Sequence, residues 1–545
     1  MKTFIIKEIL PALLFIFFFS TACHFLFSSI GFVPMDDGIF LAYSRRILDG
    51  QIPYKDFLYY ANIGTPLLYI PFVRFGGDYI FWITRYFFWF EFACIAWIWT
   101  YLITKNFLYH KTSLIFRFLL AGFAFLFCVH SFPPMAWYTV DGLFFYSLGL
   151  LFCLNKNAKL KIIGYMLVGF TYIIKQNFIF LLPSTIILLK DWKSIRFWIA
   201  LLFPSVLFYA FFLFAGAIQD VILQTTARTE FIDTAIKEYT GKFTFPWGII
   251  FGFSGVSLLY KSIKQDIAKF FLGILLIFIP ILYSFFYFHQ AGKFIFDASF
   301  LLFGSVVGIG IFFTYREKLS RNTVIILLGA IGAWCVGISG GYNSPVFASG
   351  IMLVYLLNLI NYFINNNNRL KRIVKPIWIL TLVLLIPLAV YSFYYIRTNS
   401  IYGDPATAKE IVYRADTILP GGKNILVSKD VFDTLQDLQT AIKKANNKHK
   451  PYAILSYATG LWVKSQQKNP LPLDYYFIYH TEKSLVDPLK EAIIKGKGKI
   501  IIIVKKSSLA ESQDYSNYNS VYNFASLVPE YYTKFAETKY HILFQ

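Results

Sequence analysis

Charged residues are scarce in this sequence, and their scarcity excludes most classes of soluble protein. Only 15% of the 545 residues are charged, whereas 57% are hydrophobic. A soluble domain usually has about 25% charged residues, because polar groups must cover its folded surface. We therefore predict that most of the chain lies in lipid.

Disulfide frameworks, glycosylation sequons and internal repeats are also absent from the sequence. The cysteines are odd in number and all fall within apolar runs, so they provide neither a disulfide framework nor the spacing of zinc ligands. The absence of Asn-x-Ser/Thr favours a bacterial origin. Many transporters consist of two repeated halves, and no such repeat is visible here. The five cysteines are Cys23, Cys94, Cys128, Cys153 and Cys335.

Apolar runs long enough to cross a bilayer recur through the first 396 residues. No small-residue cleavage site follows the first run, so we expect this run to remain as a membrane span. The runs lie near residues 9–30, 79–102, 114–131, 139–154, 162–189, 197–215, 246–260, 269–288, 294–314, 322–339, 344–363 and 376–395.

Basic residues fall in every second gap between these runs. The gaps contain twenty basic residues and only four acidic ones, which accounts for most of the net charge of +21. This distribution is typical of cytoplasmic loops, so the charge indicates topology and not a nucleic-acid partner. We predict a multi-pass protein of the inner (plasma) membrane with a cytoplasmic N-terminus. The basic residues are Lys2, Lys7, Lys105, Lys111, Lys156, Lys159, Lys161, Lys190, Lys193, Arg196, Lys261, Lys264, Lys269, Arg316, Lys318, Arg321, Arg369, Lys371, Arg372 and Lys375.

The run at 162–189 has basic clusters at both ends, so both ends are expected at the cytoplasmic face. One straight helix of this length would measure about 42 Å, against a bilayer core of about 30 Å. Its middle contains Lys175-Gln176-Asn177, and a polar break is tolerated where protein surrounds it. We predict a hairpin of two short helices that turns at this triplet. This gives about 13 membrane segments and places the C-terminus outside the cytoplasm.

The composition changes to that of a soluble domain after residue 396. Short β-rich runs alternate there with helical stretches such as 484–495, which is typical of a small α/β domain. The predicted fold is an α-helical polytopic membrane protein, with a transmembrane domain at 1–396 and an extracytoplasmic α/β domain at 397–545. The β-rich runs are 424–427, 452–455, 475–479 and 499–504.

The first loop predicted outside the cytoplasm, at 31–78, is longer than a connector requires and is rich in ionisable residues. Within it, Ile39, Tyr43 and Ile47 share one helical stripe, which predicts an amphipathic helix at the membrane surface. The acidic pair Asp36 and Asp37 precedes this stripe. Partial desolvation raises the pKa of a carboxyl group, so Asp36 is a candidate general base. The alternative is that Asp36 caps the helix.

Two acidic residues in the predicted spans add to this set. Asp141 opens the fourth span, where an ionisable group needs a function or a partner, and helix capping is again the alternative. Glu91 lies deeper in the second span. It either has a functional role or forms an ion pair with Lys175 or Arg85.

His289 and Lys293 lie in a short turn between two later spans, on the side predicted to be extracytoplasmic. At this position they could contact an anionic group held at the leaflet surface. Contact with lipid headgroups is the alternative interpretation.

Several short motifs occur in an order that resembles a known superfamily. They are Met35-Asp36-Asp37-Gly38, the helix that follows, residues 48–56, Thr65-Pro66-Leu67, Asp141, Lys175 and Tyr457-Ala458-Thr459-Gly460. In this order they resemble the GT-C superfamily of integral membrane glycosyltransferases. The resemblance is to the bacterial branch around the aminoarabinose transferases and the protein mannosyltransferases. The chain departs from that pattern at Asp37, where glutamate is usual, and lacks a lysine before Pro66.

The resemblance implies an inverting transfer of one sugar from a polyprenyl-phosphate donor to an acceptor hydroxyl on the extracytoplasmic face. Asp36 would be the general base, Asp37 would support it, and Asp141 would orient the acceptor or the base. The expected partners are the donor, membrane lipids and a glycan, lipid or protein acceptor of the cell envelope. No cofactor is assigned, although a divalent cation that bridges carboxylate and phosphate is compatible with this chemistry. The residues expected to meet the donor phosphate are Lys293, Lys175, Arg46 and His289.

A lipid or solute transporter, or flippase, is the alternative function, and a membrane scaffold is a third. A transporter should concentrate charges and broken helices near the membrane midplane, where only Glu91 and Lys175 lie. A scaffold would not need acidic and basic residues converging on one face.

Overall fold

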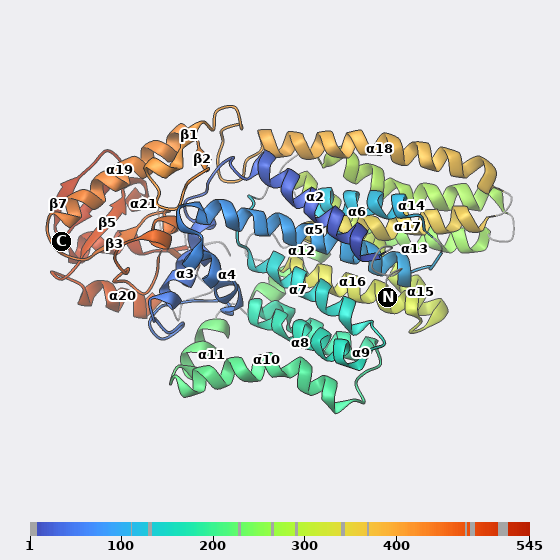
Figure 1. Cartoon of the computed structure of the whole chain (residues 1–545), viewed down its shortest axis with the longest axis horizontal. Coiled ribbons are helices and arrows are strands. Elements are labelled where there is room, and N and C mark those ends of the chain that lie inside the picture. Colours follow the sequence, from blue (N-terminus) through green and yellow to red (C-terminus); the bar gives the residue numbers. More distant parts are fainter. Residues whose placement is uncertain are drawn as a thin grey trace.

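The computed structural model describes residues 8–110, 112–128, 133–226, 230–262, 266–288, 293–338, 344–367, 370–474, 477–479, 486–510 and 521–545. Within these ranges the chain is mainly helical up to residue 399 and forms an elongated bundle (Figure 1). A smaller domain of helices and strands lies at one end of the bundle. The protein is thus a multi-span α-helical membrane protein with a C-terminal mixed-sheet domain, as predicted.

Thirteen helices of the described chain coincide with the predicted apolar runs. Seven spans are long and apolar enough to cross a membrane, and four shorter segments are also apolar. These helices form because their runs satisfy every backbone hydrogen bond internally, as lipid requires. They are α2 (Leu10–Phe27), α5 (Ile80–Asn106), α6 (Leu114–Cys128), α7 (Tyr138–Cys153), α8 (Ala158–Ile174), α9 (Leu181–Leu188), α10 (Ile195–Phe214), α13 (Thr244–Ser262), α14 (Ile267–Tyr287), α15 (Lys293–Glu317), α16 (Arg321–Gly337), α17 (Ser349–Asn366) and α18 (Lys371–Asn399).

The predicted hairpin at 162–189 is confirmed. Helix α8 ends at Ile174, the next residue Lys175 has an extended backbone (φ −152°, ψ 127°), and the short helix η3 (Gln176–Phe180) leads into α9. Asp191, which follows α9, accepts hydrogen bonds from Lys161 Nζ at 2.6 Å and from the Tyr165 hydroxyl at 2.7 Å. Because Lys161 and Tyr165 lie in the first half of α8, these bonds close the hairpin at its basic end.

The basic gaps near α2, α5 and α16 lie together. Glu8 pairs with Arg117 at 2.6 Å and with Lys105 at 3.3 Å. Arg321 Nε donates to Asn106 Oδ1 at 2.8 Å. Gaps far apart in the sequence therefore share one end of the bundle. Figure 1 shows the beginning of α2 well away from the C-terminal domain.

The C-terminal domain is built on a four-stranded mixed sheet in the order β3-β5-β8-β7. Strands β3 (Tyr452–Leu455) and β5 (Ile501–Lys505) are parallel, as expected for aliphatic runs buried on both faces. The antiparallel strands are β7 (Lys534–Glu537) and β8 (His541–Phe544). Two small pairs, β1 (Tyr413–Arg414) with β2 (Leu426–Val427) and β4 (Phe477–Tyr479) with β6 (Val521–Asn523), complete the strands described. The helices are α19 (Lys429–Asn446), α20 (Val486–Lys495), α21 (Lys506–Ala510) and α22 (Val528–Tyr531).

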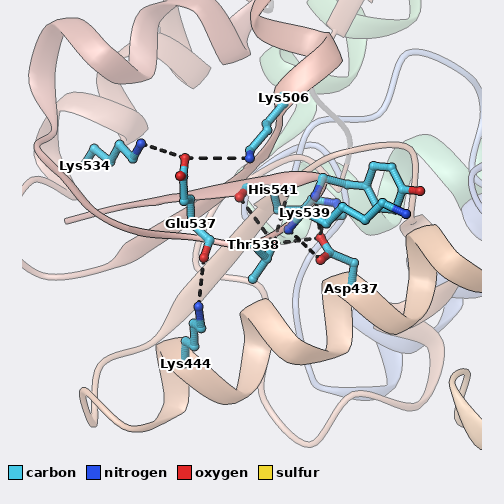
Figure 2. Close-up of polar contacts among 9 residues, drawn as sticks. Asp437, Lys444, Lys506, Lys534, Glu537, Thr538, Lys539 and His541 are labelled. Carbon is cyan, nitrogen blue, oxygen red and sulfur yellow. Dashed lines mark hydrogen bonds and ion pairs between the residues drawn. The ribbon is translucent and has the colours of Figure 1, made fainter.

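Asp437 of α19 fastens this helix to the β7–β8 hairpin (Figure 2). Its carboxylate accepts hydrogen bonds from the Thr538 hydroxyl at 2.7 Å and from the backbone N–H groups of Lys539 and Tyr540 at 2.9 Å. The buried ring of His541 adds a bond at 2.8 Å. Asp437 therefore satisfies the donors of one tight turn.

Helices α3 (Asp36–Leu48) and α4 (Gly64–Phe75) belong to the loop at 31–78 and lie between the bundle and the C-terminal domain (Figure 1). The predicted amphipathic helix is thus confirmed as α3. The predicted position of this helix at the membrane surface is not confirmed. Residues on different sides of α3 are all buried, among them Ile39, Leu41, Tyr43 and Ser44. The apolar stripe alone could not show that the C-terminal domain covers the opposite side. Two further helices, α11 (Ile218–Thr226) and α12 (Glu230–Gly241), precede α13.

Candidate functional site

Asp37 is locked into the protein by a buried ion pair with Arg85 of α5. Arg85 Nη2 donates to Asp37 Oδ1 at 2.9 Å, and the Val33 N–H donates to Asp37 Oδ2 at 2.9 Å. Arg85 also donates to the carbonyl oxygens of Ser28 and Gly31, both at 2.7 Å. Burial raises the pKa of Asp37, and the Arg85 guanidinium opposes this rise. Asp37 therefore anchors the beginning of the loop on α5.

Asp36 is only half-buried, and within the described ranges it forms no ion pair like that of Asp37. Burial and the neighbouring charge of Asp37 raise the pKa of Asp36 to about 6, while a hydrogen bond with Tyr402 opposes the rise. Helix capping is not its role, because Met35 occupies the cap position and no side-chain capping bond forms. A carboxyl group with a pKa close to neutral is suited to accept a proton.

The C-terminal domain holds the residues that precede Asp36. Within η6 (Thr459–Lys464), the Gly460 N–H donates to the Pro34 carbonyl at 2.9 Å, and the Thr459 hydroxyl donates to the Met35 carbonyl. A Cβ atom on Gly38 would lie 2.2 Å from Gly460 Cα, so the two backbones touch. The structure thus brings together the motifs at 35–38 and 457–460, which are more than 400 residues apart.

Arg46 holds the same domain at the other end of α3. Its Nη2 and Nε donate to the two carboxylate oxygens of Asp474 at 2.6 and 2.9 Å, and Nη2 also donates to the Leu471 carbonyl at 2.8 Å. Nη1 reaches Gln51 Oε1 at 3.2 Å. The guanidinium is buried. Contact between Arg46 and a donor phosphate remains a prediction, and it would require exchange of these partners.

Asp141 is fully buried where α4, α5 and α7 meet. It accepts hydrogen bonds from the Thr65 hydroxyl at 2.6 Å and the Tyr69 hydroxyl at 3.2 Å, both on α4. Glu91 of α5 is also fully buried, and it lies beside Asp141. Asp141 therefore fixes α4 to the bundle and does not cap α7. The predicted ion pair of Glu91 with Lys175 or Arg85 is wrong, because in the part of the chain that the structure describes Arg85 pairs with Asp37 and Lys175 donates to Thr139 and Ile338.

Lys175 is buried at the hairpin turn and is linked to α3 through one aromatic ring. Its ammonium donates to the Thr139 hydroxyl at 3.1 Å and the Ile338 carbonyl at 2.6 Å. It also lies 4.8 Å from the ring centroid of Tyr138. The ring of Phe40 on α3 packs edge-on against Tyr138 at 5.3 Å. The ring of Tyr138 therefore lies between the Lys175 ammonium and Phe40 of α3.

The remaining predicted phosphate contacts cannot be placed. His289 lies outside the described residues, and Lys293 is described only as the first residue of α15. Within the described ranges, no three His, Cys, Asp or Glu side chains come close enough to hold a metal ion.

An apolar cavity of about 640 Å³ opens beside the loop at 31–78. Its walls are Ile52 and Leu67 of the loop, Phe170 of α8 and Phe203 and Phe211 of α10, together with their neighbours. Gln51, which accepts the hydrogen bond from Arg46, is the polar residue of its lining. The cavity is suited to a hydrocarbon chain, because it offers almost no hydrogen-bonding groups.

Two residues that the sequence analysis did not predict as part of the site are Tyr402 and Asp474. Tyr402 follows the last span in a short linker, and Asp474 lies in a loop of the C-terminal domain between η6 and β4. Neither position has a local pattern that marks it. Only the return of the C-terminal domain onto the first loop brings these residues into contact with α3.

The fold and the loop define a multi-span membrane protein whose C-terminal domain covers α3, the helix that begins with Asp36 and Asp37. No protein-family model matches the sequence, and no curated protein matches it. Among solved structures, the chain is similar to ArnT from Cupriavidus metallidurans, described as bound to undecaprenyl phosphate. The identity is 12% and the TM-score 0.41, over 98% of this chain and 97% of that one. A likeness of this size does not decide the activity.

Proposed function

We propose that the protein is a GT-C-type glycosyltransferase, which transfers a sugar from a polyprenyl-phosphate donor to an acceptor hydroxyl with Asp36 as general base. The observation that carries this proposal is the difference between the two adjacent carboxyl groups. Asp37 is buried and paired with Arg85, whereas Asp36 is half-buried with a pKa raised to about 6. A base with these properties is ionised at neutral pH and still basic enough to take a proton.

The apolar cavity supports the class of donor. A polyprenyl chain is a long hydrocarbon, and burial of its surface contributes roughly 25 cal/mol per Å² to binding. The cavity lies between the loop that carries Asp36 and helices α8 and α10. A donor tail seated there would leave its phosphate and sugar beside that loop.

The proposed reaction is a direct displacement, because the polyprenyl phosphate is a stable leaving group. The acceptor oxygen attacks the anomeric carbon while the bond from that carbon to the phosphate oxygen breaks. The electron pair leaves with the polyprenyl phosphate, and Asp36 takes the hydroxyl proton. Attack from the face opposite the phosphate inverts the anomeric configuration.

The other predicted residues have supporting roles in this proposal. Asp37 fixes the start of α3, and Asp141 positions α4 through Thr65 and Tyr69. Lys175 would stabilise the departing phosphate, because cations that face developing negative charge lower the barrier. Lys293, His289 and Arg46 complete the proposed phosphate contacts.

The proposed location is the extracytoplasmic face of the inner membrane, with the N-terminus in the cytoplasm. The positive charge in every second gap between the spans supports this orientation, because cytoplasmic loops are rich in lysine and arginine. The acceptor would be a glycan, lipid or protein of the cell envelope.

Transfer of labelled sugar from a panel of polyprenyl-phosphate sugars to a cell-envelope extract tests the proposal. We expect Asp36→Asn to reduce transfer by about 10²- to 10⁴-fold, the usual contribution of a general base. Asp78→Asn, an exposed carboxylate in the same loop, is the matched control and should retain wild-type activity. Full activity in a folded Asp36→Asn protein would exclude Asp36 as the base. If the wild type consumes no donor but moves the prenyl lipid across vesicles, the protein is a flippase.

A further inference from the structure

Two lysine-rich segments lie side by side at one edge of the sheet in the C-terminal domain. Residues 443–451 join the end of α19 to β3, and residues 495–499 join the end of α20 to β5. Because β3 and β5 are parallel neighbours, both segments lie at the edge where these strands begin. Lys450 Nζ of the first segment donates to the Gly498 carbonyl of the second at 2.8 Å. The two segments therefore form one continuous surface.

This surface carries the excess positive charge of the domain. Residues 397–545 contain 20 basic and 14 acidic residues, and the two segments account for seven of the basic residues and none of the acidic ones. Six of the seven lysines are exposed, and Lys450 is half-buried. We call this surface the basic edge, and its lysines are Lys443, Lys444, Lys448, Lys450, Lys495, Lys497 and Lys499. Outside the basic edge, the charges of the domain nearly balance.

Two ammonium groups of the basic edge are held by oxygen atoms that carry no charge. Lys444 Nζ donates to the Glu537 carbonyl at 2.8 Å (Figure 2), and Lys450 donates to a carbonyl of the neighbouring segment. The Glu537 carboxylate is paired with two other lysines, both outside the basic edge. Within the described part of the chain, Lys495 is the lysine of this surface that forms an ion pair, with the exposed Glu491 at 2.8 Å. Most of the positive charge is therefore uncompensated.

The basic edge lies at the end of the domain that is far from the membrane bundle. Beyond the other end of β3, the chain continues into η6, where Gly460 touches α3. Strand β8 is antiparallel to β5 and pairs Phe544 with Ile502, so the last residues of the chain lie at the basic edge. Figure 1 shows the C-terminus at the end of the domain away from the transmembrane helices. Lipid around the bundle is therefore remote from these lysines.

We propose that the basic edge binds an anionic glycan polymer of the cell envelope, whose repeating units carry phosphate or carboxylate groups. A group of uncompensated lysines attracts closely spaced negative charges, and the flexible lysine side chains adapt to a polymer of variable shape. The position of the surface disfavours the lipid headgroups of the same membrane. The extracytoplasmic orientation proposed above exposes the surface to envelope glycans and not to nucleic acids. This binding is separate from sugar transfer.

Binding of the full-length protein to immobilised glycans tests the inference. The protein would be held in nanodiscs of zwitterionic lipid, and the probes would be polygalacturonate, which carries carboxylates, and phosphomannan, which carries phosphates. Dextran is the uncharged control polymer. We expect binding to both anionic glycans and not to dextran. The affinity should fall as salt is raised from about 0.1 M to about 1 M, because the screening length falls from about 10 Å to about 3 Å.

Charge reversal at two exposed positions separates the basic edge from the other basic parts of the protein. Lys497→Glu/Lys499→Glu should bind both anionic glycans about tenfold more weakly, because it replaces two attractive contacts with repulsive ones. Lys409→Glu/Lys429→Glu is the matched control, because it makes the same change in net charge at exposed positions outside the basic edge. It should bind like the wild type. Thermal unfolding should be the same in all three proteins, which excludes misfolding as the cause.

Three outcomes would overturn the inference. The first is equal affinity of the wild type and Lys497→Glu/Lys499→Glu for the anionic glycans, and the second is equal binding to dextran. The third comes from vesicles that contain phosphatidylglycerol: if the wild type binds these more tightly than either glycan and Lys497→Glu/Lys499→Glu does not, the basic edge contacts a membrane surface instead. Since none of these assays involves catalysis, their result is independent of the proposed glycosyltransferase activity.

Discussion

At the start of α3, two adjacent carboxyl groups have different surroundings. Asp37 has a guanidinium and a backbone N–H as partners, whereas Asp36 has a phenol and partial exposure. Pairs of acids that have different environments are a common way to separate a structural role from a chemical one. The same loop can therefore be rigid at Asp37 and reactive at Asp36.

The Arg85–Asp37 pair should be important for stability. Arg85→Met leaves a buried carboxylate without its cation, which should lower the free energy of unfolding by about 3–5 kcal/mol. The double variant Arg85→Met/Asp37→Leu removes both charges and should recover part of this loss. Thermal unfolding in detergent measures the effect. Arg45→Met, which breaks the more exposed pair with Asp49, should cost about 1 kcal/mol or less. Equal losses for Arg85→Met and Arg45→Met would contradict the assigned role.

At the scale of residues, the sequence could predict Asp36 but not its partners. Asp36 could be singled out because it follows the first span and stands at the beginning of an amphipathic stripe. Arg85 was considered only as a partner of Glu91 on the same span, because nothing in the sequence connects it to Asp37, which is 48 residues away. The burial of Glu91 beside Asp141, with Arg85 paired to Asp37 and Lys175 bonded to Thr139 and Ile338, was unexpected.

At the scale of elements, the contact between α3 and η6 depends on a lack of side chains. Gly38 and Gly460 meet backbone to backbone. In most helices, replacement of glycine with alanine stabilises by about 1 kcal/mol. At Gly38 the added methyl group would overlap the backbone of Gly460, so the contact must open.

Gly38→Ala should therefore destabilise the protein by about 1–3 kcal/mol, the usual cost of overpacking. Gly241→Ala, at the end of α12 with no neighbouring atom within 4 Å of the new methyl group, is the control and should be neutral or stabilising. Hydrogen exchange in residues 457–464 should increase in Gly38→Ala alone. Unchanged exchange there would show that η6 does not depend on this contact.

The helices and the hairpin were predictable because lipid imposes simple rules. The spans could be predicted from the length of the apolar runs and from the basic residues in every second gap. The polar triplet that begins at Lys175 was sufficient to predict the hairpin. The burial of α3 was not predictable, because its polar face is covered by a domain more than 400 residues away. Periodicity shows that a helix has two faces, but it does not show what covers the second face.

At the scale of the whole molecule, the C-terminal domain and the loop at 31–78 are joined along their length. Besides the contacts of Arg46 and Gly460, the Leu58 N–H donates to the Pro472 carbonyl at 2.8 Å. Just before the loop, the Ser29 carbonyl accepts from the Leu426 N–H at 2.8 Å. Lys468 Nζ reaches the Asp49 carbonyl at 2.6 Å. The domain thus holds the proposed base, the loop and one wall of the apolar cavity in a single arrangement.

The anomeric configuration of the product tests the central proposal most directly. Purified wild-type protein would be incubated with a polyprenyl-phosphate sugar of known configuration and a cell-envelope acceptor, and the new glycosidic bond examined by NMR. We expect one sugar to be transferred per donor consumed, with an anomeric configuration opposite to that of the donor. Retention of configuration would exclude direct displacement with Asp36 as general base. No donor consumption across the panel would contradict the glycosyltransferase itself.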